Sequence, residues 1–216
     1  MLTLPYNKSN RQPLNKISML RAIAHQLERP SGFFGKIISK GMDRRNRKFY
    51  QKMIAELDIQ KGDKVYEIGY GPGLGISLIA QSHPGCLISG IDFSDLMVRM
   101  ATKRNQEFID KGMVTLKYGD LLTTETGQER YDKIFCVNVI YFWKELNPVF
   151  TKISSMLNNG GTFCIFMTSA KELNDYKFPE NFNKYSAEEV ERELKKAGFQ
   201  NVEYKLDKGY YITSRK

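Results

Sequence analysis

The chain has 216 residues, of which 41% are hydrophobic, so it can bury the core of one domain and is not expected to be disordered as a whole. It contains no apolar run near the roughly 18 residues of a membrane-spanning helix, and its first residues lack the apolar stretch of a secretory signal. The three cysteines are odd in number and far apart, which argues against disulfides and zinc ligands. We therefore expect a soluble cytoplasmic protein that holds no metal.

The net charge of +9 has two interpretations. Excess positive charge attracts nucleic acids and anionic membrane surfaces, and residues 43–48 form the densest basic cluster. Elsewhere the basic residues are spread along the chain, and many stand beside acids, as in residues 188–196. That distribution is typical of solvated helix faces. We therefore favour a small-molecule substrate over a nucleic acid.

Residues 1–57 have the pattern of a helical extension. Apolar residues recur at helical spacing over 16–28, which predicts a helix with one apolar stripe. A break with proline and glycine follows, and a longer helix is expected to start at Asp43 or Asn46. We expect this extension to act as a cap or lid on a core over residues 58–216, within a single domain.

Residues 65–75 are the most informative stretch. An apolar strand runs into Glu67, and glycines then stand at every second position, where they permit positive φ and close approach of a ligand. The dinucleotide fingerprint G-x-G-x-x-G fails, because Leu74 and Ile76 stand where its third glycine is needed, and no Walker lysine follows. A carboxylate repels phosphate and attracts an ammonium group. Glu67 therefore favours a zwitterionic amino-acid ligand over a pyrophosphate.

Strands and helices alternate through the rest of the core. Strands are expected near 64–69, 87–92, 113–118, 132–138 and 161–168, and helices near 75–82, 95–110 and 145–157. This alternation predicts an α/β fold with a parallel sheet and helices on both faces. Right-handed crossovers bring the ends of the first, second and fourth strands to one rim, where ligands bind.

Two further patterns mark helix starts and the end of the chain. Ser94 or Asp95 can cap the helix over 95–110. Ser186 and Glu189 have the spacing of a capping box, which predicts a helix there. A hairpin is expected around the turn at residues 207–209.

Four segments, in order, resemble the motifs of class I S-adenosylmethionine-dependent methyltransferases. They are residues 67–73, 87–92, 114–121 and 131–138. The chain is also similar to the small-molecule methyltransferases of the ubiquinone/menaquinone-biosynthesis-like group. The resemblance implies a Rossmann-like seven-stranded sheet, mostly parallel with an antiparallel last strand, and an N-terminal helical cap.

The resemblance also implies S-adenosylmethionine as the cofactor and S-adenosylhomocysteine as its product. By motif position, Asp92 would bind the ribose hydroxyls, Phe93 would lie against the adenine, and Asp120 would face the adenine edge. The whole implied cofactor site consists of Glu67, Gly69, Tyr70, Gly71, Gly73, Asp92, Phe93, Asp120, Leu121 and Asn138.

Aromatic residues mark the expected acceptor side. A dense run follows Asn138, and further aromatics lie in the N-terminal extension and before the last helix. They can contact the acceptor, or they can be ordinary core packing, and the sequence weights the two about equally. The expected pocket consists of Phe33, Phe34, Tyr141, Phe142, Trp143 and Tyr185.

No strong general base stands out. His25 and Tyr141 are the candidate catalytic residues, although such a histidine is more often structural. We therefore expect methyl transfer to a small or medium apolar or aromatic metabolite, by in-line displacement and mainly through positioning. The alternatives are an RNA methyltransferase, motivated by the +9 charge, and a non-catalytic cofactor-binding scaffold, motivated by the missing base.

Overall fold

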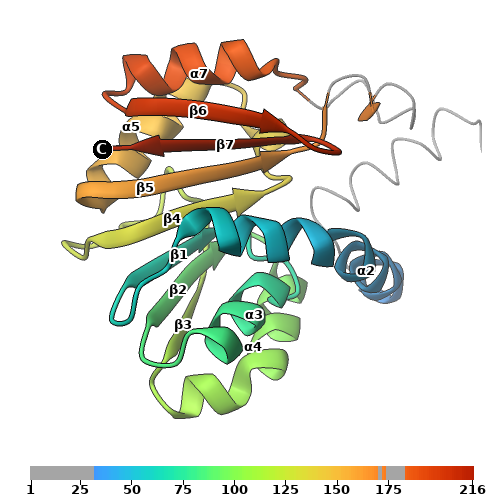
Figure 1. The fold of residues 1–216 in the computed structure, drawn as a ribbon. Helices are drawn as coiled ribbons and strands as arrows, with labels where there is room; N and C mark the ends of the chain where they lie inside the picture. Colours follow the sequence, from blue (N-terminus) through green and yellow to red (C-terminus); the bar gives the residue numbers. More distant parts are fainter. Residues whose placement is uncertain (1–31, 170–171, 174–182) are drawn as a thin grey trace, which may run out of the picture.

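A computed structural model describes residues 32–169, 172–173 and 183–216 of the chain (Figure 1). The helix predicted over 16–28, including His25, lies outside the described residues. Phe33 and Phe34 lie in a described helix, but their side chains are outside what the structure describes.

One seven-stranded sheet forms the middle layer, as predicted. Its strands are β1 (Lys64–Ile68), β2 (Leu87–Asp92), β3 (Val114–Tyr118), β4 (Tyr131–Val137), β5 (Leu157–Met167), β6 (Gln200–Leu206) and β7 (Tyr210–Arg215). Their order across the sheet is β3-β2-β1-β4-β5-β7-β6. β1 to β5 pair in parallel, and β7 runs antiparallel between β5 and β6. This confirms the predicted mostly parallel sheet with an antiparallel last strand.

Helices cover both faces of the sheet (Figure 1). The helices α2 (Gly32–Leu57), α3 (Leu74–Ser82) and α4 (Asp95–Asp110) pack against one another on one face. The pair α5 (Leu146–Met156) and α7 (Ala187–Lys196) covers the other, and the short 3₁₀ helix η1 (Ile140–Phe142) follows β4. Each face buries its own hydrophobic core, so the sheet is covered on both sides.

The predicted caps are present. The Ser94 hydroxyl accepts a hydrogen bond from the Met97 N–H at the start of α4. At α7, Ser186 Oγ accepts from the Glu189 N–H at 3.2 Å, and the Glu189 carboxylate accepts from the Ser186 N–H at 2.8 Å. These bonds satisfy N–H groups that a helix start otherwise leaves unpaired.

Two predicted boundaries were wrong. α2 starts at Gly32 and not at Asp43 or Asn46, because no proline interrupts residues 32–57 and glycine inside a helix costs only about 1 kcal/mol. β5 starts at Leu157 and not at 161, because Leu157 already pairs with Tyr131 of β4 before a register shift. Within the described residues, no helix has the length and apolar character needed to cross a membrane.

Candidate active site

The turn between β1 and α3 is built on three left-handed glycines. Gly69, Gly71 and Gly73 have φ values of 67°, 52° and 78°. A Cβ at Gly69 would lie 2.6 Å from Val139 Cγ2, whereas a Cβ at Gly71 would meet no atom within 4 Å. The turn is therefore tightly packed at its first glycine and open at its second. A ligand can approach the main chain at Gly71.

Glu67 lies beneath this turn. Its carboxyl is fully buried, and Oε1 accepts a hydrogen bond from the Tyr50 hydroxyl of α2 at 2.8 Å. Burial raises the pKa of Glu67 well above its usual range, and the hydrogen bonds from Tyr50 and the Ile76 backbone lower it in part. The carboxyl does not line the cavity described below. In this structure Glu67 joins α2 to the first turn of α3.

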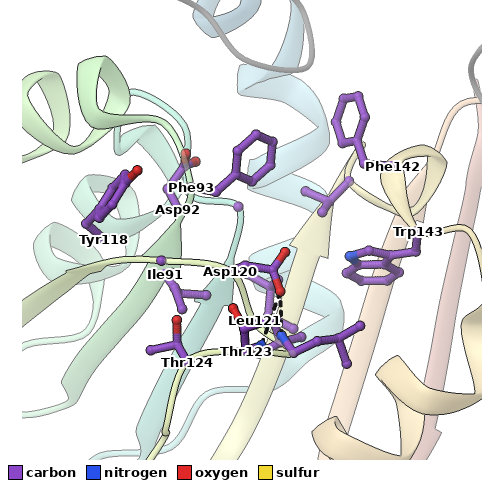
Figure 2. A pocket seen from close by; sticks show the side chains of 15 residues that line it. Ile91, Asp92, Phe93, Tyr118, Asp120, Leu121, Thr123, Thr124, Phe142 and Trp143 are labelled. Atoms are coloured by element: carbon purple, nitrogen blue, oxygen red, sulfur yellow. Dashed lines mark hydrogen bonds between the residues drawn. The ribbon is translucent and has the colours of Figure 1, made fainter.

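A cavity of about 580 Å³ opens at the carboxyl ends of β1, β2 and β4 (Figure 2). It brings together seven of the predicted site residues, namely Gly69, Asp92, Phe93, Asp120, Leu121, Phe142 and Trp143. Sequence reasoning missed other lining residues, among them Tyr118, Leu122, Thr123, Thr124 and Val139. Tyr118 and Leu122 could have been suspected, because each flanks a predicted motif acid by two positions.

Asp92 ends β2 at the edge of the cavity. Its Oδ2 accepts a hydrogen bond from the Gly71 N–H, and its Oδ1 accepts one from the Ser94 N–H, both at 2.8 Å. Burial raises the pKa of Asp92 to about 6, while the two backbone donors lower it. The carboxylate thus fixes the second glycine of the turn and presents negative charge to the cavity.

Asp120 follows β3 and closes the next turn. Its Oδ1 accepts hydrogen bonds from the N–H groups of Leu122 at 2.8 Å and Thr123 at 3.3 Å, the dashed lines of Figure 2. These bonds hold the carboxyl group at the cavity wall, on the same side as Asp92 and Phe93 (Figure 2).

Aromatic residues form the opposite wall. Phe142 and Trp143 come from η1 and the residue after it, and Figure 2 shows both facing the cavity across from Asp92. Trp143 packs edge-on against Phe150 of α5, with ring centroids 6.3 Å apart. The wall is therefore anchored in the core of the α5 face.

Tyr141, in contrast, points away from the cavity. It is 4% exposed, and its hydroxyl donates to Asn138 Oδ1 at 3.0 Å and lies 3.3 Å from the Thr168 carbonyl. The same hydroxyl accepts a hydrogen bond from the Thr168 N–H. The Tyr141 oxygen is thus engaged within the protein, and neither Tyr141 nor Asn138 lines the cavity, so the role of Tyr141 as a substrate contact or proton acceptor stays a prediction.

Asn138 is the centre of this polar network. It has a left-handed φ of 58°, and its Oδ1 also accepts from Thr168 Oγ1 at 3.0 Å. Its Nδ2 donates to Asn46 Oδ1 of α2 at 3.4 Å. The network ties the ends of β4 and β5 to the N-terminal helix. Sequence reasoning missed Asn46 and Thr168, because the contacts join residues far apart in the chain.

Two more predicted residues have structural positions. Tyr70 is fully buried, and its hydroxyl donates to the Lys117 carbonyl at 3.0 Å. Tyr185 donates to the Trp143 carbonyl at 2.6 Å, and burial and then Glu189 raise its pKa. Neither lines the cavity. Tyr185 supports the aromatic wall from behind.

Comparison with known proteins agrees with this geometry. Residues 65–161 match the family model of a methyltransferase domain. The chain is 28% identical to the uncharacterized methyltransferase YdaC of Bacillus subtilis, over 73% of this chain and 83% of that protein. Both matches are to methyltransferases. The chain is also 24% identical to the sterol 24-C-methyltransferase ERG6 of Saccharomyces cerevisiae, over 57% of this chain but only 32% of that enzyme.

A solved structure shows the same fold. It is phosphoethanolamine N-methyltransferase 2 of Haemonchus contortus in complex with phosphomonomethylethanolamine and S-adenosylhomocysteine, with a TM-score of 0.64 and 20% identity. The match covers 88% of this chain and 44% of that one. That structure holds S-adenosylhomocysteine, the product form of S-adenosylmethionine. The residues present fit that group, because the turn is open at Gly71 and the adjoining cavity carries buried Asp92.

Proposed function

We propose that the protein moves a methyl group from S-adenosylmethionine to a small or medium apolar or aromatic metabolite. The observation that carries the proposal is that carboxylates and aromatic rings occupy different walls of the cavity. Asp92 and Asp120 stand on one wall, and Phe142 and Trp143 stand on the other (Figure 2). One wall thus suits a polar adenosyl group, and the other suits an apolar acceptor.

The chain's own residues would mainly bind and orient. Asp92 would accept hydrogen bonds from the ribose hydroxyls, and Phe93 and Asp120 would contact the adenine. The glycine turn would let the cofactor lie against the main chain. The cofactor, when bound, supplies a methyl group already activated by the sulfonium. Holding an acceptor in line with that methyl, away from water, then lowers the barrier.

The cavity offers little for proton removal. Its titratable lining residues are Asp92, Asp120 and Tyr118, on the wall assigned to the cofactor. An acceptor that is already nucleophilic, such as an amine, an acidic hydroxyl or a stabilised carbanion, needs no strong base. Phe142 and Trp143 would stabilise positive charge near the methyl group through cation–π contact.

The finer assignments are part of the proposal. Membership of the ubiquinone/menaquinone-biosynthesis-like group is one of them, and the name of the yeast relative, a sterol methyltransferase, agrees with an apolar acceptor. His25, Phe33 and Phe34 stay predictions for the acceptor side, as part of a cap formed by residues 1–57. Location in the cytoplasm and a single domain are also proposed.

A labelled-methyl transfer assay tests the proposal. The full chain is incubated with a trideuteromethyl cofactor and fractionated metabolite extract, and products are detected by mass spectrometry. We expect a mass increase in an apolar or aromatic fraction, together with formation of S-adenosylhomocysteine. Cofactor binding without any labelled acceptor would instead support the non-catalytic scaffold.

An RNA methyltransferase is the second candidate. The observation in its favour is the exposed basic surface of α2, which includes Arg44, Arg47 and Lys48. The cavity wall argues against it, since among the described residues the lining contains two carboxylates and no Lys, Arg or His. Filter binding at two salt concentrations separates the two candidates, because RNA affinity carried by phosphate contacts falls steeply with salt.

A further inference from the structure

Two glycines of the turn are held by β2, and the third is held by α4. The Gly69 N–H donates to a carbonyl of β2 at 2.8 Å, and the Gly71 N–H donates to the Asp92 carboxylate at 2.8 Å. The carbonyl of the third glycine, Gly73, is held by Asn105 of α4, whose Nδ2 donates to it at 3.1 Å. Asn105 belongs to none of the four sequence motifs.

The environment of Asn105 is unusual for a helix residue. Its φ and ψ of −106° and 15° depart from helical values within α4, and its side chain is fully buried. Nδ2 also donates to the Ala101 carbonyl at 3.0 Å. Oδ1 is buried and has no hydrogen-bond partner among the described residues. A buried acceptor without a donor lowers the free energy of unfolding. An apolar side chain of similar shape at this position would avoid that cost.

The contact acts at the start of α3. Gly73 is the N-cap of that helix, and α3 has no side-chain cap of its own. The Gly73 carbonyl also accepts the Ser77 N–H at 3.1 Å, the first hydrogen bond of the helix. Asn105 therefore fixes the direction of the carbonyl from which α3 begins, and with it the N–H groups of the turn.

We propose that Asn105 is a positioning residue for S-adenosylmethionine. It would act through Gly73, holding the third glycine and the first turn of α3 in the binding conformation while its unpaired Oδ1 lowers the stability of the free protein. This inference rests on the proposed function, because it assumes that the cofactor lies against the glycine turn. Loss of stability at a site that serves binding is a recurring pattern in enzymes.

The test separates affinity from stability. Asn105→Leu removes both donors and the unpaired acceptor and keeps the branching and the number of side-chain heavy atoms. We expect its Kd for S-adenosylhomocysteine, measured by calorimetric titration, to rise about tenfold, while its Tm stays within about 3 °C of the wild type. Asn105→Asp keeps the shape but lacks the donors, so it should show the same loss of affinity if the leucine variant does not fold.

Val149→Ala is the matched control. Val149 is 1% exposed on α5, on the other face of the sheet, so its truncation should lower Tm by several degrees and leave the Kd within about twofold. A wild-type Kd in both Asn105 variants would overturn the inference. It would also be overturned if Kd rose in proportion to the loss of Tm in the two Asn105 variants and in Val149→Ala alike. If the wild type itself binds no cofactor, the proposed function fails, which is a separate result.

Discussion

The two walls of the cavity are built by different means. On the wall that we propose for the cofactor, Asp92 and Asp120 are held by backbone N–H groups, most of them within three residues of the acid. The polar network at Asn138, which precedes Phe142 and Trp143 in the chain but does not line the cavity, joins residues up to 92 positions apart, since it reaches Asn46. The two carboxylates are therefore held mainly by contacts that are local in sequence, whereas the network at Asn138 depends on contacts between distant segments. The predictions below test this difference.

The largest effect is expected at Gly73. In Gly73→Ala the new Cβ would lie 2.6 Å from Asn105 Nδ2 and 2.8 Å from Ala101 Cβ, at a φ of 78°. Strain and overpacking together should lower the free energy of unfolding by about 2–4 kcal/mol and abolish cofactor binding. Gly71→Ala is the control, because its φ is also positive but a Cβ there meets no atom within 4 Å. It should lose only about 1–2 kcal/mol in urea unfolding. Equal losses in the two variants would contradict the packing argument.

Next in size is the effect of pH on Asp92. Since its pKa is about 6, its carboxylate gains a proton as pH falls from 7 to 5, and affinity for S-adenosylhomocysteine should fall with it, about tenfold over that range. The contribution of Asp92 to the free energy of unfolding changes with pH in the opposite direction to the affinity. The raised pKa stabilises the cofactor-free protein at low pH, and this contribution is lost as pH rises through 6.

Titration calorimetry at several pH values checks the prediction for Asp92. Asp92→Asn should bind weakly and should lose the pH dependence between 5 and 7. If the variant retains the wild-type pH profile, another group controls binding.

Tyr141→Phe should affect stability and not cofactor binding. The variant loses the hydroxyl contacts to Asn138 and Thr168, which should lower the free energy of unfolding by about 1–2 kcal/mol. The Kd for the cofactor should stay within about twofold, because neither Tyr141 nor Asn138 lines the cavity. Denaturant titration and calorimetry measure the two quantities. Unchanged stability with loss of methyl transfer would restore Tyr141 as a catalytic candidate.

The smallest effect is expected at Tyr185. Removing its hydroxyl in Tyr185→Phe deletes the bond to the Trp143 carbonyl, and because the residue is only half-buried we expect a loss of about 0.5–1 kcal/mol. Thermal unfolding gives the shift in Tm. A change in cofactor affinity would show that the two walls are coupled, contrary to the comparison above.

The sequence predicted the fold well, and it placed several of the predicted site residues in one cavity. The strand and helix pattern led to the seven-stranded sheet, and motif spacing led to Gly69, Asp92, Phe93 and Asp120, all of which line the cavity. These features follow from short-range patterns. The direction of a side chain was harder to predict. Glu67 stays a prediction as a ligand contact, and the structure adds that it accepts a hydrogen bond from Tyr50, on a helix that no local signal places beside it.

The acceptor wall was predicted in part. The aromatic run after Asn138 was identified as a unit, but in the structure it divides, with Tyr141 in the core and Phe142 and Trp143 at the cavity. The division follows from the turn of η1, which places successive side chains on different sides. Asn46 and Asn105 were missed because their partners, Asn138 and Gly73, are far away in the sequence and come close only in the folded chain.

The most direct test of the account is a crystal structure of the protein with S-adenosylhomocysteine. We predict the ribose hydroxyls on the Asp92 carboxylate, the adenine between Phe93 and the Asp120 edge, and the sulfur facing the wall formed by Phe142 and Trp143. Adenosyl density elsewhere on the protein, with the cavity beside the glycine turn empty, would contradict the assignment of that wall to the cofactor.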